Sequence, residues 1–281
     1  MITRFAPSPT GPLHLGHAFS ALTAWDMARA LGGTCLLRIE DIDTARCRPE
    51  FETAIYDDLH WLGLTWPTPV LHQSSRQTAY ANALRQLADL GLTYPCSCTR
   101  SDIRAALSAP QEGGAHTGPD GPLYPGTCRG RAMQTRKNSD AIRLDMAKTL
   151  AYLKGANLWF QETGPRHHGV HQITPQTLTE SIGDIVLARK DIATSYHLSV
   201  VVDDAAQEIT HVVRGEDLFA ASQIHVLLQT LLGLNVPTYH HHRLIRDQEQ
   251  KRLAKRDNAR AIATYRLAGQ SPDDIRKRLH L

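Results

Sequence analysis

Two histidines close to the N-terminus, in the segment RFAPSPTGPLHLGH, could take part in phosphate chemistry. His14 and His17 are three residues apart, so both imidazoles can face one side of the first turn of a helix. As protonated groups or as neutral N–H donors, they could stabilise charge on a leaving pyrophosphate. Gly16 between them would let a flat base or a ribose approach the backbone. A rigid turn with surface histidines fits the spacing equally well, so spacing alone leaves both interpretations open.

Three cysteines in a segment rich in glycine and proline form a second chemically capable group. Cys96 and Cys98 flank a single residue, and Cys128 ends the sequence YPGTC. Zinc binds thiolates readily and takes four ligands, and ligand chemistry alone favours His116 for the fourth position. Such an ion would be structural, because a segment with so few apolar residues cannot fold by burial alone. Three buried free thiols are the alternative.

The elements around the opening segment predict a parallel sheet. ITRFAP is typical of a short buried strand that ends at Pro7, because proline cannot donate to a ladder. Apolar residues then recur at helical spacing from Ala18 to Ala30, LGG ends the helix, and TCLLRIE predicts a second strand. This order indicates a βαβ unit. The opening segment would then lie at the carboxyl end of a strand, where such sheets bind ligands.

The rest of the chain predicts an α/β nucleotide-binding domain that is split by an insertion. Helical periodicity recurs at Pro49–Leu62, Arg76–Leu90 and Ser222–Leu232. The sequence HLSVVVDDAAQEITHVVRGED has two apolar runs separated by a polar turn, which predicts adjacent strands. We expect the first half of this domain, the insertion and the second half of the domain to span 1–93, 94–190 and 191–281.

Composition excludes several other classes of protein. The 281 residues carry a formal charge of +3, so polyanion binding would need local patches. No apolar run approaches the ~20 residues of a membrane span, and the N-terminus has no apolar core typical of a signal peptide. Five cysteines, an odd number, favour reduced thiols or metal ligands over a disulfide framework. We expect a cytoplasmic protein that is not in a membrane, with the monomer as its default state.

Several motifs together resemble the class I glutamyl-tRNA synthetases. RFAPSPTGPLHLGH and LRIEDID resemble the start of these enzymes, with HLGH as their HIGH motif, and YPCSCTR, LYPGTCRG, VVVDDA and THVVRGEDL match further along. RLAKR matches the KMSKS element, with Arg252 and Ala254 as departures that could alter the dynamics of that loop. The resemblance implies a Rossmann-type parallel sheet of the class I aminoacyl-tRNA synthetases, split by a zinc-binding insertion.

The distance from RLAKR to the C-terminus narrows the expected function. Only 25 residues follow Arg256, too few for a helical anticodon-binding domain. The shortened form resembles the glutamyl-Q tRNA(Asp) synthetases. That resemblance implies activation of L-glutamate with ATP in the absence of tRNA, followed by transfer to the queuosine base at the wobble position of tRNA(Asp). A minimal glutamyl-tRNA synthetase that charges tRNA(Glu) and a catalytically idle glutamate-binding paralogue are the alternatives.

The resemblance also implies roles for individual residues. Glutamate has two carboxylates and an ammonium, so its pocket requires arginines and an acid. The implied glutamate-binding residues are Arg4, Ala6, Ser8, Glu40, Tyr196 and Arg214. The implied residues for Mg-ATP are His14, Gly16, His17 and Lys255, of which the two histidines and the lysine would be catalytic. The implied zinc ligands are Cys96, Cys98, Tyr124 and Cys128. The resemblance thus gives Tyr124 as the fourth ligand, whereas ligand chemistry alone favours His116.

One further histidine run has no implied role. The sequence YHHHRLI contains three consecutive histidines, His240, His241 and His242, and such a run suggests a metal site. Neighbouring side chains on a strand point to opposite faces, so three consecutive histidines cannot readily converge on one ion. We expect the run to lie near the ATP site or on the surface.

Overall fold

The N-terminal βαβ unit is present as expected. The computed structural model describes residues 1–108, 117–246 and 260–281 of the chain. Strand β1 (Ile2–Phe5) pairs in parallel with β2 (Thr34–Ile39), and helix α1 (Leu15–Ala30) connects them. Buried alanines line the face of α1 toward the sheet and allow close packing, with the Thr3 hydroxyl donating to the carbonyl oxygen of Ala24 at 3.0 Å. The predicted parallel sheet is therefore confirmed.

The sheet extends on both sides of this unit. Strand β3 (Leu71–His72) pairs in parallel with β2. On the other side, the backbone N–H of Thr210 donates to the carbonyl oxygen of Ile2 at 3.0 Å and places β11 (His211–Gly215) beside β1. Strand β11 pairs in parallel with β12 (Thr238–His242). Strand β12 in turn pairs in parallel with β8 (Leu158–Glu162), which is antiparallel to β9 (Gly169–Ile173).

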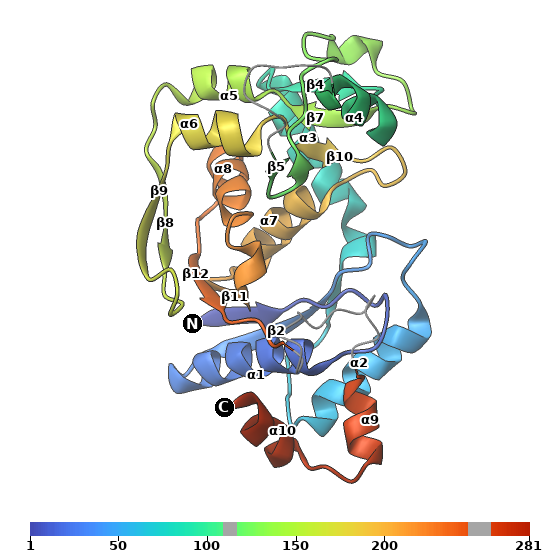
Figure 1. Ribbon diagram of the computed structural model, residues 1–281, viewed down its shortest axis with the longest axis vertical. Helices are drawn as coiled ribbons and strands as arrows, with labels where there is room; N and C mark the ends of the chain where they lie inside the picture. Colours follow the sequence, from blue (N-terminus) through green and yellow to red (C-terminus); the bar gives the residue numbers. More distant parts are fainter. Residues whose placement is uncertain (109–116, 247–259) are drawn as a thin grey trace.

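Helices cover both faces of this sheet. Helix α1 lies on one side, and α7 (Tyr196–Ala206) and α8 (Ser222–Leu232) lie on the other (Figure 1). Near β3, α2 (Pro49–Trp61) and α3 (Gln77–Asp89) have bounds close to those expected, and the 3₁₀ turn η1 (Gln73–Arg76) leads into α3. A second 3₁₀ turn, η4 (Glu216–Leu218), follows β11. The carboxyl ends of β1, β2 and β11 consequently point to one edge of the sheet.

The prediction of two adjacent strands in HLSVVVDDAAQEITHVVRGED is wrong for its first half. That half forms α7, whose N-cap is Ser195, with the Ser195 hydroxyl oxygen accepting from the backbone N–H of Leu198 at 3.3 Å. Most residues of α7 are buried, because it packs between α8, α3 and the sheet. A helix buried on most sides shows no amphipathic period, so its β-branched run imitates a buried strand.

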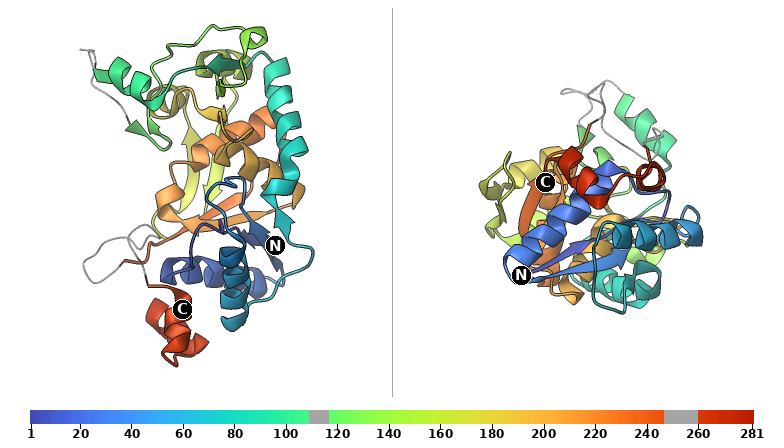
Figure 2. Two further views of the ribbon diagram at one scale, coloured as in Figure 1. Left: turned by 90° about the vertical axis from the view of Figure 1, so that its right-hand side faces the viewer. Right: turned by 90° about the horizontal axis from the view of Figure 1, so that it is seen from below.

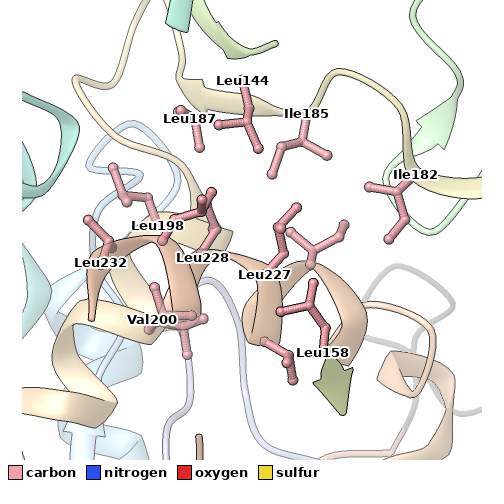
Figure 3. Close-up of a cluster of buried hydrophobic side chains, with 14 of the residues drawn as sticks. Leu144, Leu158, Ile182, Ile185, Leu187, Leu198, Val200, Leu227, Leu228 and Leu232 are labelled. Carbon is pink, nitrogen blue, oxygen red and sulfur yellow. The ribbon is translucent and has the colours of Figure 1, made fainter. Parts of the chain in front are cut away.

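A smaller antiparallel sheet lies in the part of the molecule that contains Cys96, Cys98 and Cys128. Its strands have the order β10 (Val186–Ala188), β7 (Ala141–Leu144) and β4 (Thr93–Cys96). Leucines of β7 and β10 meet leucines of α7 and α8 in the core that joins this sheet to the large one (Figure 3). The short elements around it are α4 (Arg100–Ser108), β5 (Thr117–Gly118), β6 (Gly121–Pro122), η2 (Met133–Thr135), α5 (Met146–Leu153), α6 (Pro175–Thr177) and the π-helical η3 (Leu178–Ile182). The domain boundaries at residues 93 and 190 stay predictions.

The last two helices lie at the opposite end of the molecule from Cys96, Cys98 and Cys128 (Figure 2). Helix α9 (Ile262–Leu267) contacts α2, and α10 (Pro272–Leu279) packs against α1. Arg276 of α10 donates to both carboxylate oxygens of Asp26 in α1, at 2.7 and 3.0 Å. Across the three described stretches of chain, we find no helix with the length and apolarity to cross a membrane.

Candidate active site

A cavity of about 410 Å³ opens at the edge where β1, β2 and β11 end. It collects nine of the residues expected to bind glutamate or ATP, from the loop after β1, the start of α1, the end of β2, the start of α7 and β11. These residues are Arg4, Ala6, Ser8, His14, Gly16, His17, Glu40, Tyr196 and Arg214. The tenth, Lys255, lies outside the described residues. Residues distant in the sequence therefore share one site.

The proline-rich loop after β1 is tied to the segment that follows β2. The carbonyl oxygen of Pro7 accepts from the backbone N–H of Glu40 at 3.0 Å, and that of Pro9 accepts from the backbone N–H of Arg48 at 3.0 Å. The prolines restrict φ, and the hydrogen bonds hold the loop at both points. The loop is thus a fixed wall of the cavity.

His14 and His17 cap the helix that carries them. The backbone N–H of Gly16 donates to Nδ1 of His14, and the backbone N–H of His14 donates to Nδ1 of His17, both at 3.1 Å. The ring centroids are 3.8 Å apart. Because each Nδ1 accepts a hydrogen bond, a neutral ring must carry its proton on Nε2. Of the two chemical forms considered from the sequence, this geometry favours neutral imidazole N–H donors.

A buried cluster of four charges forms one side of the cavity. Nε and Nη2 of Arg4 donate to the two oxygens of Asp204 at 2.9 and 3.3 Å, and Nη1 of Arg38 donates to Asp204 Oδ1 at 2.7 Å. Nη2 of Arg38 donates to Glu40 Oε1 at 3.1 Å. Burial favours the neutral form of Asp204, but Arg4 and Arg38 outweigh it and lower the pKa of that carboxyl.

The pKa of Glu40, in the same cluster, is shifted in the opposite direction to that of Asp204. Burial raises the pKa of Glu40, and the attraction of Arg38 and Arg4 offsets this only in part. A cation bound in the cavity would favour the ionised carboxylate. The role of Glu40 as the partner of an ammonium group stays a prediction.

Arg214 lines the cavity from β11, the strand beside β1, and its surroundings differ from those of Arg4. Its Nε donates to Nε2 of His241 at 3.1 Å and its Nη1 to Nδ1 of His225 at 3.0 Å. Its Nη2 donates to the hydroxyl of Ser222 at 2.7 Å. Tyr196 lines the cavity at the start of α7, and burial raises the pKa of its phenol.

Several residues in and around the cavity were not expected from the sequence. Asp204 and Arg38, which lie behind the lining, hold Arg4 and Glu40 in place, and both lie in motifs already noted, VVVDDA and LRIEDID. A charged residue inside an apolar run was the available signal for both. Of the histidine run, His242 lines the cavity, whereas His241 is buried and does not line it. Unexpected lining residues are Thr10, Ser20, Asp217, Arg243 and Leu244.

A second, larger cavity of about 1180 Å³ adjoins the first. The two cavities share Ser8, Thr10, Glu40 and Tyr196 in their linings. A ligand bound in one cavity would therefore lie next to a ligand bound in the other. Six basic side chains line the larger cavity: Arg46, Arg100, Arg104, Arg143, Arg189 and Lys190. Five acidic side chains line it as well: Glu40, Asp43, Asp120, Asp184 and Asp191. Of the basic residues, Arg46 and Arg189 pair with these acids. The other basic side chains could contact a ligand that carries phosphates.

The three expected thiols come together beside the larger cavity. The sulfur atoms of Cys96, Cys98 and Cys128 lie within 4.8 Å of one another and could hold a metal ion. The Tyr124 hydroxyl is 3.4 Å from Cys96 Sγ and 3.3 Å from Cys98 Sγ. Burial raises the pKa of Tyr124, so its ionisation would depend on a bound cation. His116 lies outside the described residues.

The fold and the two cavities define the catalytic domain of a class I tRNA synthetase. Residues 1–281 match the family described as tRNA synthetases class I (E and Q), catalytic domain, and the chain belongs to that family. It is 58% identical to the glutamyl-Q tRNA(Asp) synthetase of Rhodobacter capsulatus, over 100% of both chains. It is 42% identical to the protein of the same name from Nocardia farcinica, over 97% of this chain and 81% of the relative.

Solved structures support the same fold. A glutamate-tRNA synthetase from Elizabethkingia anophelis superposes with a TM-score of 0.71 at 28% identity. That match covers 92% of this chain and 53% of the other, so the chain spans about half the length of that structure. A methionyl-tRNA synthetase from Mycobacterium tuberculosis, with a TM-score of 0.61 at 10% identity, shares the fold alone.

Proposed function

We propose that this chain activates L-glutamate with ATP, in the absence of tRNA, and transfers the glutamyl group to the queuosine base of tRNA(Asp). The observation that carries the proposal is the cavity at the ends of β1, β2 and β11. Two arginines and one glutamate from separate elements meet there, which matches a ligand with two carboxylates and one ammonium. The names of the relatives that are 58% and 42% identical support the same substrates.

In this proposal the charged residues of the cavity bind glutamate. Arg4 and Arg214 contact one carboxylate each, and Glu40 accepts from the ammonium. Tyr196 supplies a hydrogen-bonding wall, and Ala6 and Ser8 complete the lining. The α-carboxylate is then held beside the histidines at the start of α1.

Activation requires positioning and charge stabilisation more than proton transfer. An α-carboxylate oxygen of glutamate attacks the α-phosphorus of Mg-ATP, the bond to the β-phosphate oxygen breaks, and pyrophosphate leaves with the released electron pair. The Nε2–H groups of His14 and His17 donate to the phosphates, while Gly16 lets the nucleotide approach. Lys255, assigned from its motif, is the proposed cation for the phosphates. The described residues on either side of its segment support this, since Ile245 lines the cavity and Ala261 pairs with His14.

The larger cavity is the proposed place of the acceptor. A hydroxyl of queuosine attacks the carbonyl carbon of glutamyl-adenylate, AMP leaves, and the hydroxyl proton is released. The basic lining would contact the phosphates of the anticodon stem-loop. The wall that the two cavities share supports this proposal, because a hydroxyl bound in the larger cavity would lie next to an adenylate bound in the smaller one.

We also propose that the thiol cluster holds one structural zinc ion, with Tyr124 as the fourth ligand. The tyrosine hydroxyl is within 3.4 Å of two of the three sulfur atoms, which suits the corner of a small tetrahedral site. Such an ion would cross-link β4 to the YPGTC segment. The monomeric state and the cytoplasmic location expected from the sequence stay predictions.

The function is tested with the purified protein, labelled glutamate, ATP, and tRNA(Asp) that either contains or lacks queuosine. We expect glutamate-dependent exchange of pyrophosphate into ATP without tRNA, and labelling of the queuosine-containing tRNA(Asp) alone. Labelling of tRNA(Glu) would instead identify a minimal glutamyl-tRNA synthetase. Glutamate binding without pyrophosphate exchange would identify an idle paralogue.

A further inference from the structure

Arg214 is a buried cation whose immediate contacts in the described parts of the chain are neutral. Beyond the His241, His225 and Ser222 contacts given above, its Nη2 also donates to the carbonyl oxygen of Leu218 at 3.3 Å. Arg4, in contrast, has its Nε and Nη2 taken by a carboxylate. The charge of Arg214 is therefore less quenched by its own neighbours than that of Arg4.

The two rings beside Arg214 must have defined tautomers. A guanidinium only donates, so Nε2 of His241 and Nδ1 of His225 must both present a lone pair. His241 then carries its proton on Nδ1. His225 carries its proton on Nε2, which donates to Nδ1 of His197 at 3.0 Å.

A buried carboxylate determines the state of His241. Nδ1 of His241 donates to Oε2 of Glu162 in a very short hydrogen bond, and neither side chain is exposed. The other oxygen of Glu162 accepts from the backbone N–H groups of Gly164 at 2.5 Å and of His241 at 2.9 Å. Burial raises the pKa of Glu162, but these hydrogen bonds outweigh it and lower the pKa to about 2.

We infer that Glu162 and His241 are positioning residues for substrate recognition: the carboxylate holds the ring in the tautomer that accepts from Arg214, and the ring orients Arg214 toward the cavity. Glu162 lies at the end of β8 and does not line the cavity. The imidazole keeps this carboxylate out of contact with Arg214, so the positive charge of the guanidinium is not neutralised by Glu162. Four of the five N–H groups of Arg214 are held by protein acceptors, which fixes the guanidinium and leaves one Nη1 N–H for a ligand. This inference rests on the proposed binding of a carboxylate substrate by Arg214.

The variant Glu162→Gln tests this arrangement with little change in volume. Its amide oxygen must face the two backbone N–H groups, so its NH₂ group must face Nδ1 of His241. The ring then has to move its proton to Nε2, where it meets the N–H of Arg214. We expect the KM for glutamate in pyrophosphate exchange to rise about tenfold or more, because a buried donor loses its acceptor. The KM for ATP should stay within about twofold, since Glu162 is outside the cavity.

Matched variants separate positioning from folding. His240→Gln changes the neighbouring ring, which contacts the Thr163 hydroxyl at 3.0 Å and lies outside the cavity, and should leave the KM for glutamate unchanged. His241→Gln keeps an acceptor that can reach Arg214 and should recover most of the affinity that His241→Leu loses. ¹⁵N chemical shifts of the His241 ring should show a protonated Nδ1 in the native protein and a protonated Nε2 in Glu162→Gln.

Two results would overturn the inference. One is a KM for glutamate in Glu162→Gln within about twofold of that of the native protein, a change too small for a lost buried hydrogen bond. The other is an equal loss in kcat and in both KM values that follows a fall in thermal stability. Failure of the proposed function looks different, because the native protein itself would then show no glutamate-dependent exchange.

Discussion

Asp204 and Arg4 are separated by 200 residues in the chain and form a buried ion pair, with Asp204 Oδ1 2.9 Å from Arg4 Nε. The pair joins α7 to β1, and both elements contribute residues to the lining of the smaller cavity. Asp204 accepts from Nε and Nη2 of Arg4, and the Val213 carbonyl oxygen accepts from Nη1 at 3.4 Å, which leaves one N–H on each Nη for the proposed substrate.

Asp204→Asn should lower the free energy of unfolding by about 3 kcal/mol in urea denaturation, because two buried arginines lose their shared counter-charge. Asp191→Asn, which disrupts an exposed pair with Arg189, should cost less than about 1 kcal/mol. The pKa of Asp204 is lowered in the folded protein, so its contribution is complete above the unfolded value and is lost as the pH falls through the folded one. Equal costs for the two variants would contradict this account.

Arg214→Lys should raise the KM for glutamate by about tenfold to a hundredfold, because lysine keeps the charge but loses the planar set of donors. The KM for ATP should change little. Steady-state pyrophosphate exchange with each substrate varied in turn measures both values. A rise in the KM for ATP alone would place Arg214 at the nucleotide instead.

Gly16→Ala should reduce kcat for pyrophosphate exchange. A Cβ atom at this position would lie 3.0 Å from Cε1 and 3.1 Å from Nδ1 of His14, so the ring would have to shift. We expect a loss of about tenfold or more in kcat, because the displaced ring no longer points its donor at the phosphates. An unchanged kcat in a variant of native thermal stability would argue against a role of His14 at the phosphates.

Asp58→Asn should stabilise the protein at neutral pH. Asp58 is buried, its Oδ1 has no hydrogen-bond partner among the described residues, and burial raises its pKa to about 6. An acid whose pKa is raised on folding makes the folded state less stable above that pKa, and the penalty shrinks as the pH falls from that pKa toward the unfolded value. Thermal melts should show a gain at pH 7.5 that is clearly smaller at pH 4.5. Asp57→Asn, at the exposed neighbour, should show no such pH dependence.

Cys98→Ser should lower the metal content of the protein and its melting temperature together, because three of the four proposed ligands bind zinc much less tightly than four. Cys47→Ser, at a cysteine outside the thiol cluster, should retain the metal content of the native chain. Elemental analysis of both variants after dialysis gives the comparison. Full zinc occupancy in Cys98→Ser would remove that residue from the ligand set.

The local sequence pattern was sufficient to predict the elements that show a clear hydrophobic period or that end at a proline or glycine. The βαβ unit was predictable because Pro7 and LGG mark the end of a strand and the end of a helix. Helix α7 was not, because its burial on most sides removes the polar face that identifies a helix. The thiol cluster was predictable from motif spacing, since Cys96, Cys98 and Cys128 converge as expected.

The sequence by itself determined which residues are candidates for the chemistry, because side-chain type and motif spacing are local properties of the chain. Through the family resemblance it proposed Arg4, Glu40 and Arg214 as partners for a substrate with two carboxylates and an ammonium. Only the tertiary structure decided what each guanidinium contacts: Arg4 pairs with a carboxylate in α7, whereas Arg214 donates to a neutral ring that a second carboxylate holds. These contacts depend on distance and burial between segments far apart in the chain, and no local pattern encodes either quantity.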